Sequence, residues 1–314
     1  MLSSAVHNFV DPDAYAAAIR QTRAQLTVVG RGQFTGQIIR IDMHRLWMQR
    51  LSESLPHIVH TNSLGGRAVI SFRTHSGPAL SWNGFDLQPA DIIRHRESGS
   101  SYRYTSGANS TGAMSLPLED MDSVAVMAGC DLTPPRDMLV VTPQPEAMAK
   151  LQRLHAAAGQ LAEAAPDVLA HPEAARALEQ ALVEAMTGCL STCDTAEERS
   201  AQRRHERIMR RFHEQVEMHL CGPLYVPEIC RAIGVAERTL RICCHEQLGM
   251  SPKRYLLARR MHLARQDLSR AEPGSTTVTE VASRYGFWHF GRFTAAYYAS
   301  FGETPSSTVA RLSE

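Results

Sequence analysis

The sequence predicts an α+β protein of two domains, a β-rich N-terminal domain that ends in helices and an all-α C-terminal domain. Short strand-like stretches separated by glycine and serine dominate residues 32–128. Two apolar patterns with helical spacing follow between residues 144 and 190. The region from Leu224 to Pro305 then contains the same pair of helices twice. A chain of 314 residues has the length of about two ordinary domains.

The strand-like stretches indicate either a β-sandwich or a small barrel. They are short, turn residues recur between them, and no long helical pattern interrupts them. We expect strands at residues 38–41, 68–72, 91–95, 102–105 and 124–127. The β-rich part should extend to about residue 143, within an N-terminal domain of residues 1–190.

Two amphipathic helices are expected over residues 144–190, with a break at residues 166–172. Each buries one apolar stripe, formed by Met148, Leu151, Leu154 and Leu161 in the first helix and by Leu178, Leu182, Met186 and Leu190 in the second. The stripes fit packing within the chain or against a second subunit, so a homodimer stays open. Residues 191–202 are polar and predict a linker to a domain of residues 203–314.

Each half of the duplicated region predicts a helix-turn-helix, at about residues 226–249 and 278–302. In each copy a short apolar helix ends at a glycine, Gly234 or Gly286, where a helix C-terminus favours a positive φ. Between the copies, the segment from Pro252 to about Ser269 predicts a helix of about 27 Å. Because one turn of B-DNA measures about 34 Å, we expect this helix to space two reading helices for successive major grooves.

The duplicated region resembles the DNA-binding domain of the AraC/XylS family of transcriptional regulators, over residues 211–311. The matching motifs are Glu237-Arg238-Thr239-Leu240, Gly249 with Ser251-Pro252, Tyr255-Leu256, Ala264-Arg265, Gly286-Phe287, Phe293, and Gly302 with Thr304-Pro305. A narrower resemblance, to regulators of the ethanolamine-operon type, lies in residues 286–293 and 305–308. The chain departs from the family pattern at Ile242 and Ala295, where many relatives carry arginine, and at Ala236, where serine usually caps the helix.

The family resemblance implies a sequence-specific regulator of transcription, an activator in the simplest case, that responds to a small-molecule effector. It implies a cupin-like β-barrel in the N-terminal domain as the effector-binding and dimerisation unit, with double-stranded DNA and RNA polymerase as partners. The narrower resemblance implies ethanolamine with a cobalamin cofactor. Its residues lie in the DNA-binding half, however, so the sequence assigns no effector and no cofactor.

The charge distribution supports a nucleic-acid partner for the C-terminal half. Residues 203–314 hold 17 Lys and Arg against 11 Asp and Glu, a net charge of +6, whereas residues 1–202 hold 16 against 21, a net charge of −5. No apolar run reaches the roughly 18 residues of a membrane span, and no signal-like segment opens the chain. We therefore expect a cytoplasmic protein.

The exposed sides of the two second helices should read bases, because arginine can donate two hydrogen bonds to a guanine edge. The candidates are Arg238, Thr239, Arg241, His245, His289, Arg292 and Thr294. For His289 a helix-capping role is the alternative. Arginines on the preceding and connecting helices should contact phosphates, and these are Arg207, Arg211, Arg254, Arg259 and Arg260.

Enzymatic motifs are absent from the sequence: there is no dinucleotide fingerprint, no phosphate loop, no Gly-x-Ser-x-Gly and no His-Glu-x-x-His. We therefore expect no catalytic residues and no metal site. One alternative is a metal-dependent cupin-type enzyme, for which His57, His60, His75 and His95 supply imidazoles. Another is a thiol-redox sensor built on Cys243-Cys244, with accessory DNA binding. A third is an architectural DNA-binding protein without an effector.

Overall fold

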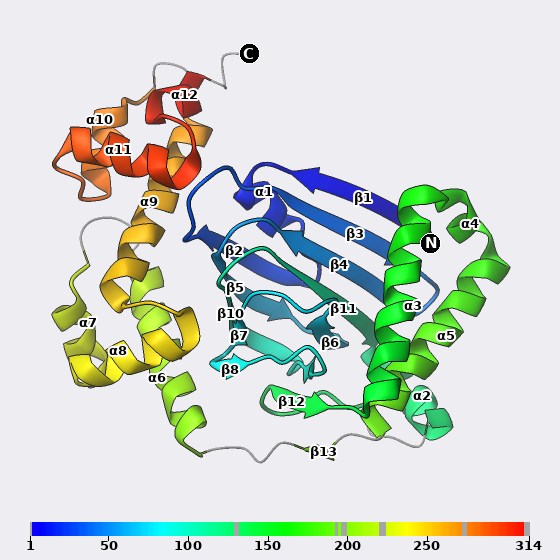
Figure 1. The fold of residues 1–314 in the computed structure, drawn as a ribbon. Helices are drawn as coiled ribbons and strands as arrows, with labels where there is room; N and C mark the ends of the chain where they lie inside the picture. The colour runs from blue at the N-terminus through cyan, green and yellow to red at the C-terminus, as the bar shows by residue number, and fades with distance from the viewer. Residues whose placement is uncertain are drawn as a thin grey trace.

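The protein has a layered architecture in which two β-sheets lie between two groups of helices (Figure 1). The computed structural model describes residues 2–128, 132–191, 194–195, 200–219, 224–271 and 275–310. One helical group covers the outer face of the larger sheet. The other is the C-terminal domain, which lies against the outer face of the smaller sheet.

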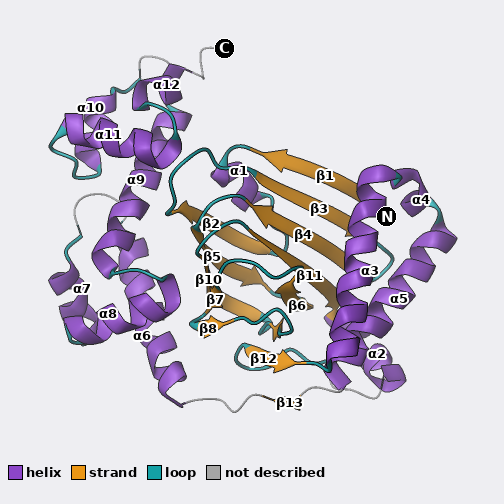
Figure 2. Ribbon diagram, in the orientation of Figure 1, coloured by secondary structure: helices purple, strands orange, loops and turns teal. Residues whose placement is uncertain are grey.

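Two antiparallel sheets form the N-terminal domain (Figure 2). The larger sheet contains, in spatial order, β1 (Ser3–Phe9), β3 (Gly36–Asp42), β4 (Trp47–Glu53), β11 (Asn109–Pro117), β6 (Arg67–Arg73), β9 (Ile92–Arg94), β12 (Leu139–Thr142) and β13 (Asp194–Thr195). The smaller sheet contains β2 (Thr22–Val28), β5 (His57–Leu64), β10 (Ser98–Thr105), β7 (Leu80–Trp82) and β8 (Phe85–Asp86). Short helix α1 (Pro12–Ala17) connects β1 to β2 and begins at Asp11, whose carboxylate caps it.

The two sheets form an open sandwich, since no hydrogen-bonded strand pair joins them within the described residues. The prediction of a closed cupin-like barrel was therefore wrong: the described strands form an open sandwich. Four of the expected strands are confirmed, at residues 38–41, 68–72, 91–95 and 102–105, although β9 is shorter than expected. Residues 124–127 belong instead to helix α2 (Met121–Ala128), which follows the 3-10 turn η1 (Leu118–Asp120). A short apolar run has no periodicity long enough to distinguish strand from helix.

Strand alternation gives each sheet one face toward the sandwich interior and one face toward helices. On β5, Val59 and Thr61 point between the sheets, whereas Ile58 belongs to the core of the C-terminal domain. On β10, Arg103 points inward and Tyr104 packs against the C-terminal helices. One face of the smaller sheet therefore lines a cavity, and the other face packs against the C-terminal domain.

Helices α3 (Pro145–Ala164), α4 (Pro166–Ala170) and α5 (Pro172–Ser191) cover the outer face of the larger sheet (Figure 1). The predicted stripes are confirmed as core residues or as partly buried residues packed on that core. Packing within the chain accounts for both stripes. The expected break at residues 166–172 contains α4, because Pro166 and Pro172 each begin a new helix.

The C-terminal helices are α6 (Ser200–Met218), α7 (Val226–Ile233), α8 (Glu237–Leu248), α9 (Pro252–Arg270), α10 (Val278–Arg284), α11 (Phe290–Phe301) and α12 (Pro305–Ala310). Both predicted helix-turn-helix units are present, as α7 with α8 and α10 with α11. Gly234 and Gly286 have φ of 69° and 74°, as the helix ends require. Half of the predicted linker, residues 192–193 and 196–199, lies outside the described residues, and α6 already begins at Ser200. Among the described helices none has the length and apolar composition of a membrane span.

The C-terminal domain docks on the smaller sheet through α8. Gly249 ends this helix with φ of 63°, and a Cβ atom at this position would lie 2.2 Å from Cε1 of Tyr104 on β10. Gly234 ends α7 with a similar φ of 69°, but a Cβ atom there would meet nothing within 4 Å. Both glycines therefore adopt a positive φ, but only Gly249 lies against a side chain of the N-terminal domain.

Gly249→Ala should reduce stability more than Gly234→Ala. Both variants incur the roughly 1–2 kcal/mol cost of a left-handed non-glycine residue, and only the first also forces Tyr104 to move. Thermal unfolding of the two purified variants measures the difference. Equal melting temperatures would show that the contact between Gly249 and Tyr104 does not hold the domains together.

Several buried histidines stabilise the fold in their neutral form. Burial lowers the pKa of His57, His60, His95 and His155 to about 4. His60 stacks on Tyr102 of β10 with ring centroids 4.4 Å apart, and it lies at the domain interface because it also stacks on His213 of α6 at 5.9 Å. Because an unfolded histidine titrates near 6.5, the unfolded chain binds more protons below that pH.

The melting temperature should therefore fall as pH is lowered from about 6.5 toward 4. Each buried histidine contributes on the order of 1.4 kcal/mol per unit of depressed pKa. Circular-dichroism melts across this range measure the effect, and His60→Phe, which keeps a stacked ring without a titrating group, should show a shallower fall. A melting temperature that is constant from pH 7.5 to pH 4.5 would contradict the assignment.

Candidate functional site

Helix α8 presents polar side chains on the side opposite its buried face. Leu240, Cys243, Cys244 and Leu248 are fully buried, whereas Arg238, Arg241 and His245 are exposed and Thr239 is half-buried. Nη2 of Arg241 donates to Oε1 of Glu237 at 2.9 Å. No side chain caps the helix at Ala236, as the departure from the family pattern predicts. The four base-reading candidates of the first unit thus lie on one accessible surface.

Helix α11 has the same organisation at the other end of α9 (Figure 1). Phe293 and Tyr297 are buried, and His289, Arg292 and Thr294 are exposed. His289 stands at the start of the helix without a capping hydrogen bond from its side chain. A Cβ atom on Gly291 would meet nothing within 4 Å, so no tight helix crossing explains that glycine. The second unit therefore offers its own accessible reading surface.

The predicted phosphate contacts divide into two groups. Arg207, Arg211 and Arg254 are exposed. Arg260 is half-buried and its guanidinium lies 5.2 Å from the ring centroid of Phe287. Arg259 is only 5% exposed, and this departs from the prediction.

Arg259 is occupied by contacts inside the protein. Its Nη2 donates to Oε1 of Glu217 at 2.5 Å, and its Nη1 donates to Oε1 of Gln25 on β2 at 3.1 Å. Because the N-terminal domain covers this side of α9, Arg259 cannot reach a phosphate in this arrangement.

Comparison with known proteins agrees with the C-terminal geometry. A family profile described as a helix-turn-helix domain matches residues 229–311. The probable thc operon regulatory protein of Rhodococcus erythropolis is 42% identical over 102 residues, and XylDLEGF operon transcriptional activator 3 of Pseudomonas putida is 38% identical over 96 residues. Residues 229–311 therefore match a helix-turn-helix domain, and this part of the chain is similar in sequence to these two regulators.

The aligned part covers 32% and 31% of this chain and 31% and 29% of the two relatives, so the chain spans less than a third of their length. Both relatives are named for the regulation or activation of an operon. Neither is named as a regulator of an ethanolamine operon.

Similar solved structures include the AraC-like transcriptional activator CuxR, with 12% identity, a TM-score of 0.43 and coverage of 84% of this chain and 96% of that chain. A probable AraC family transcriptional regulator from Rhodopseudomonas palustris CGA009 is 30% identical, has a TM-score of 0.31 and covers 34% of this chain and 97% of its own.

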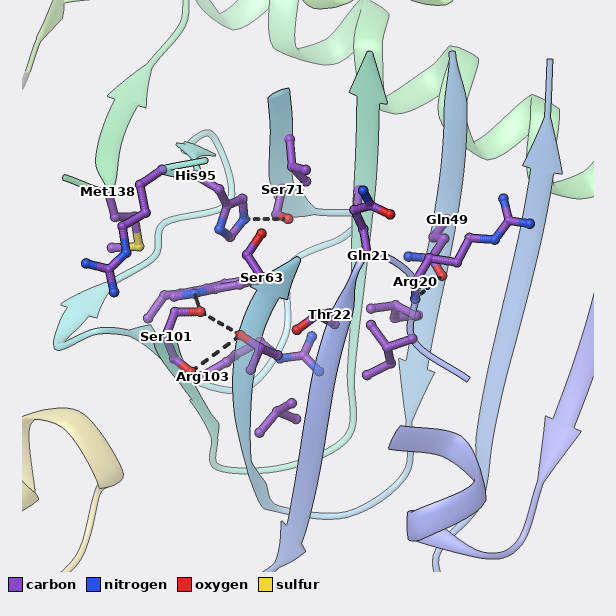
Figure 3. Close-up of a pocket in the computed structure, with 18 of the residues that line it drawn as sticks. Arg20, Gln21, Thr22, Gln49, Ser63, Ser71, His95, Ser101, Arg103 and Met138 are labelled. Atoms are coloured by element: carbon purple, nitrogen blue, oxygen red, sulfur yellow. Dashed lines mark hydrogen bonds between the residues drawn. The ribbon is translucent and has the colours of Figure 1, made fainter. Parts of the chain in front are cut away.

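The N-terminal domain contains a cavity of about 100 Å³ between its sheets (Figure 3). Strands of both sheets line it. Its apolar wall is formed by Trp47, Leu51, Val59, Trp82, Ala113 and Met138. Hydroxyl groups of Thr61, Ser71 and Ser101 face the same space, and Ser71 is held by a hydrogen bond with Nε2 of His95 at 2.9 Å.

The charged groups that line this cavity are all arginines, namely Arg20, Arg96 and Arg103, and no carboxylate is among the lining residues. Arg103 is held inside the sandwich by hydrogen bonds to Glu53 and Thr111. Glu53 lies behind it and accepts from the hydroxyl of Tyr15 at 2.7 Å. Burial opposes ionisation of Glu53, but Arg103 and His57 keep the pKa of this carboxyl below its usual value. The ion pair therefore joins the larger sheet to the smaller one.

The metal-site alternative finds no support in the described part of the chain, where no three His, Cys, Asp or Glu side chains could hold one ion. His57 instead shares a hydrogen bond through Nδ1 with the carbonyl of Leu55 at 2.7 Å, and His60 stacks on Tyr102. The thiol alternative is also disfavoured. Cys243 and Cys244 are fully buried, and burial raises the pKa of both thiols, that of Cys243 to about 11.

Sequence reasoning missed the hairpin between β7 and β8. Asn83 and Gly84 form its two-residue turn with φ of 49° and 83°. Nδ2 of Asn83 donates to Oε1 of Glu206 on α6 at 2.9 Å, and Gly84 lies against Gln247 of α8. An Asn-Gly pair between apolar residues is a strong hairpin signal, so the turn was predictable from sequence. Its contact with the C-terminal helices was not.

Proposed function

We propose that this protein is a sequence-specific DNA-binding regulator of transcription whose N-terminal domain binds a small-molecule effector. The single observation that carries the proposal is the pair of accessible polar surfaces on α8 and α11, held at the two ends of α9. The 19 residues of α9 span about 28 Å, which is close to one turn of B-DNA. Two such helices on one rigid body suit adjacent major grooves.

Base reading is assigned to the exposed residues of α8 and α11, and phosphate contact to Arg207, Arg211 and Arg254. Arg238 and Arg292 lie near the starts of their helices, where recognition helices usually contact base edges. Ile242 is 44% exposed on α8 and supplies an apolar contact where relatives have arginine. A thymine methyl group is the natural partner for such a side chain.

The cavity between the sheets is the proposed effector site. Its walls are largely apolar, and its charged lining groups are all cationic. These features suit a small molecule with an apolar body and one acidic group, because Arg96 forms no ion pair among the described residues, whereas Arg20 and Arg103 pair with Asp42 and Glu53. The names of the relatives, which regulate operons, support a role in switching a metabolic operon.

Activation of transcription through RNA polymerase and homodimer formation are parts of the same proposal. The family resemblance supports both, and the operon transcriptional activators of Pseudomonas putida support the first. An ethanolamine effector with cobalamin is the less favoured version, because the small cavity with its arginines suits an acidic compound better than an amine.

Arg238→Ala should weaken binding to a selected DNA duplex by about 1–3 kcal/mol and relax the preference at one base pair. Arg254→Ala should weaken binding to all sequences alike and reduce the salt dependence by about one ion. The operator is first obtained by selecting a randomised duplex library with the full-length protein, and titrations at several salt concentrations follow. If the selection yields no preferred sequence, the proposed function is wrong. If Arg254→Ala relaxes the base preference and Arg238→Ala weakens binding to all sequences alike, the assigned residue roles are wrong.

Ala113→Leu should fill the cavity and remove the response to effector. Ala113 is 8% exposed and lines the cavity from β11, so added methyl groups occupy the proposed site. The test is a thermal-shift screen of aromatic and short-chain carboxylic acids, with the corresponding neutral amides as controls. An effector at about 100 times its dissociation constant adds about 2.7 kcal/mol of stability. If no acid stabilises the wild type, or if Ala113→Leu responds equally, the effector assignment fails.

A further inference from the structure

A second cavity lies between the two domains. It has a volume of about 190 Å³, several times the roughly 30 Å³ that a water molecule takes in the liquid. The N-terminal domain contributes Asn83, Arg96, Ser100, Tyr102 and Asp137 to its lining, and helices α6 and α8 contribute Glu206, Arg207, Arg210 and Gln247. The effector site proposed above lies between the sheets, on the inner side of the smaller sheet, whereas this cavity lies on the outer side.

The lining contains a buried acceptor without a partner. Gln247 is 2% exposed, and its Oε1 accepts no hydrogen bond within the described residues. An unpaired buried amide oxygen is destabilising unless a donor reaches it. Both polar atoms of the neighbouring Asn83, which is 3% exposed, already have a partner, because its Nδ2 donates to Glu206 and its Oδ1 accepts from the backbone amide of Tyr102 at 2.8 Å. Gln247 is therefore the group that a ligand with a donor would satisfy.

Charges of both signs face the same space. Three guanidinium groups, those of Arg96, Arg207 and Arg210, stand against the two carboxylates of Asp137 and Glu206. Burial raises the pKa of Glu206, while Arg96 and Arg210 act in the opposite direction, which places these groups near one another. With both acids ionised, the lining carries a net charge of +1, and none of its three arginines forms an ion pair within 4 Å among the described residues.

We propose that this interdomain cavity binds a small dicarboxylic amino acid. The arginines bind its carboxylates, since guanidinium groups pair with carboxylates through two parallel hydrogen bonds. Its ammonium group donates to Oε1 of Gln247. The ligand's net charge of −1 balances the net charge of +1 on the lining. Because the lining carries charges of both signs, it excludes the apolar acids that suit the cavity between the sheets.

A ligand in this position joins α6 and α8 to the smaller sheet and so stabilises the docked arrangement of the first helix-turn-helix unit. Asn83 and Arg96 line both cavities, so each of these residues can contact a ligand in either site. Occupancy of one cavity therefore changes the affinity of the other through these two residues.

The test is calorimetric titration and thermal shift of the full-length protein, without DNA, using L-glutamate, glutarate and 4-aminobutyrate. Glutarate lacks the ammonium group and 4-aminobutyrate lacks one carboxylate. We expect L-glutamate to bind at least about tenfold more tightly than either, which corresponds to one lost charged hydrogen bond. Equal affinity for glutarate and L-glutamate, or no binding of L-glutamate, would overturn the proposal.

Variants on neighbouring positions of α6 provide the matched control. Arg210→Ala should weaken L-glutamate binding by about tenfold or more, whereas Arg211→Ala, one residue further on and outside the cavity, should bind as the wild type does. Gln247→Met keeps the volume and should remove the preference for L-glutamate over glutarate. If Arg210→Ala and Arg211→Ala respond alike, the stabilisation is a general solute effect and the site is rejected.

These outcomes are independent of the proposed DNA-binding function. Ala113→Leu fills only the cavity between the sheets, so it should retain L-glutamate binding. A protein that bound L-glutamate but selected no DNA sequence would refute the regulator and keep the interdomain site.

Discussion

Helix α9 is the element on which the arrangement of the whole molecule depends, because three different parts of the protein pack on it. Tyr255 and Leu256 belong to the core of the first helix-turn-helix unit. Met261, Ala264 and Leu268 belong to the core of the second. The remaining side faces the N-terminal domain, where Nη1 of Arg265 donates to Asp11 at 3.2 Å and Nε2 of Gln266 donates to Asp13 at 2.6 Å. The N-terminal domain thus contacts the helix that sets the spacing between the two reading surfaces.

The polar character of this interface fits a contact that forms and breaks. Buried ion pairs contribute little net stability, because desolvation of both charges offsets their attraction, but they require one geometry. Arg259, His262 and Arg265 are each less than a tenth exposed and each has a partner in the N-terminal domain. When the domains separate, all of these groups regain water. The interface therefore favours one orientation without making separation very costly, as in many contacts between domains of one chain.

Docking leaves the base-reading candidates uncovered. Arg238, Arg241, His245 and Arg292 are all exposed while α8 and α9 pack against the smaller sheet. The N-terminal domain consequently cannot regulate DNA binding by covering these side chains. What it can change is the angle between the two units, since it contacts Glu246 and Gly249 near the end of α8 and Gly302 at the end of α11.

The sequence predicted well those features that local residues determine. The glycines at positions 234 and 286 and the apolar spacing on either side of them specify each helix-turn-helix within about 25 residues. The apolar stripes of α3 and α5 could be predicted for the same reason, because each depends only on the residue spacing within one helix. Arg259 was misjudged for the opposite reason: its partner Gln25 is 234 positions away, and a basic helix face looks the same whether water, phosphate or another domain covers it. The cavities escaped prediction because each is lined by residues from distant strands and helices.

Asn83 shows how a single turn can connect the two cavities. Its positive φ is set by the two-residue hairpin, so the side chain leaves the sheet in a fixed direction. That direction places the amide between the space inside the sandwich and the carboxylate of Glu206 on α6. A molecule that draws the amide inward must weaken its hydrogen bond with Glu206, and a molecule that holds Glu206 must limit the inward movement. Because linkage is reciprocal, we expect ligand binding at the two proposed sites to be coupled with equal strength in both directions.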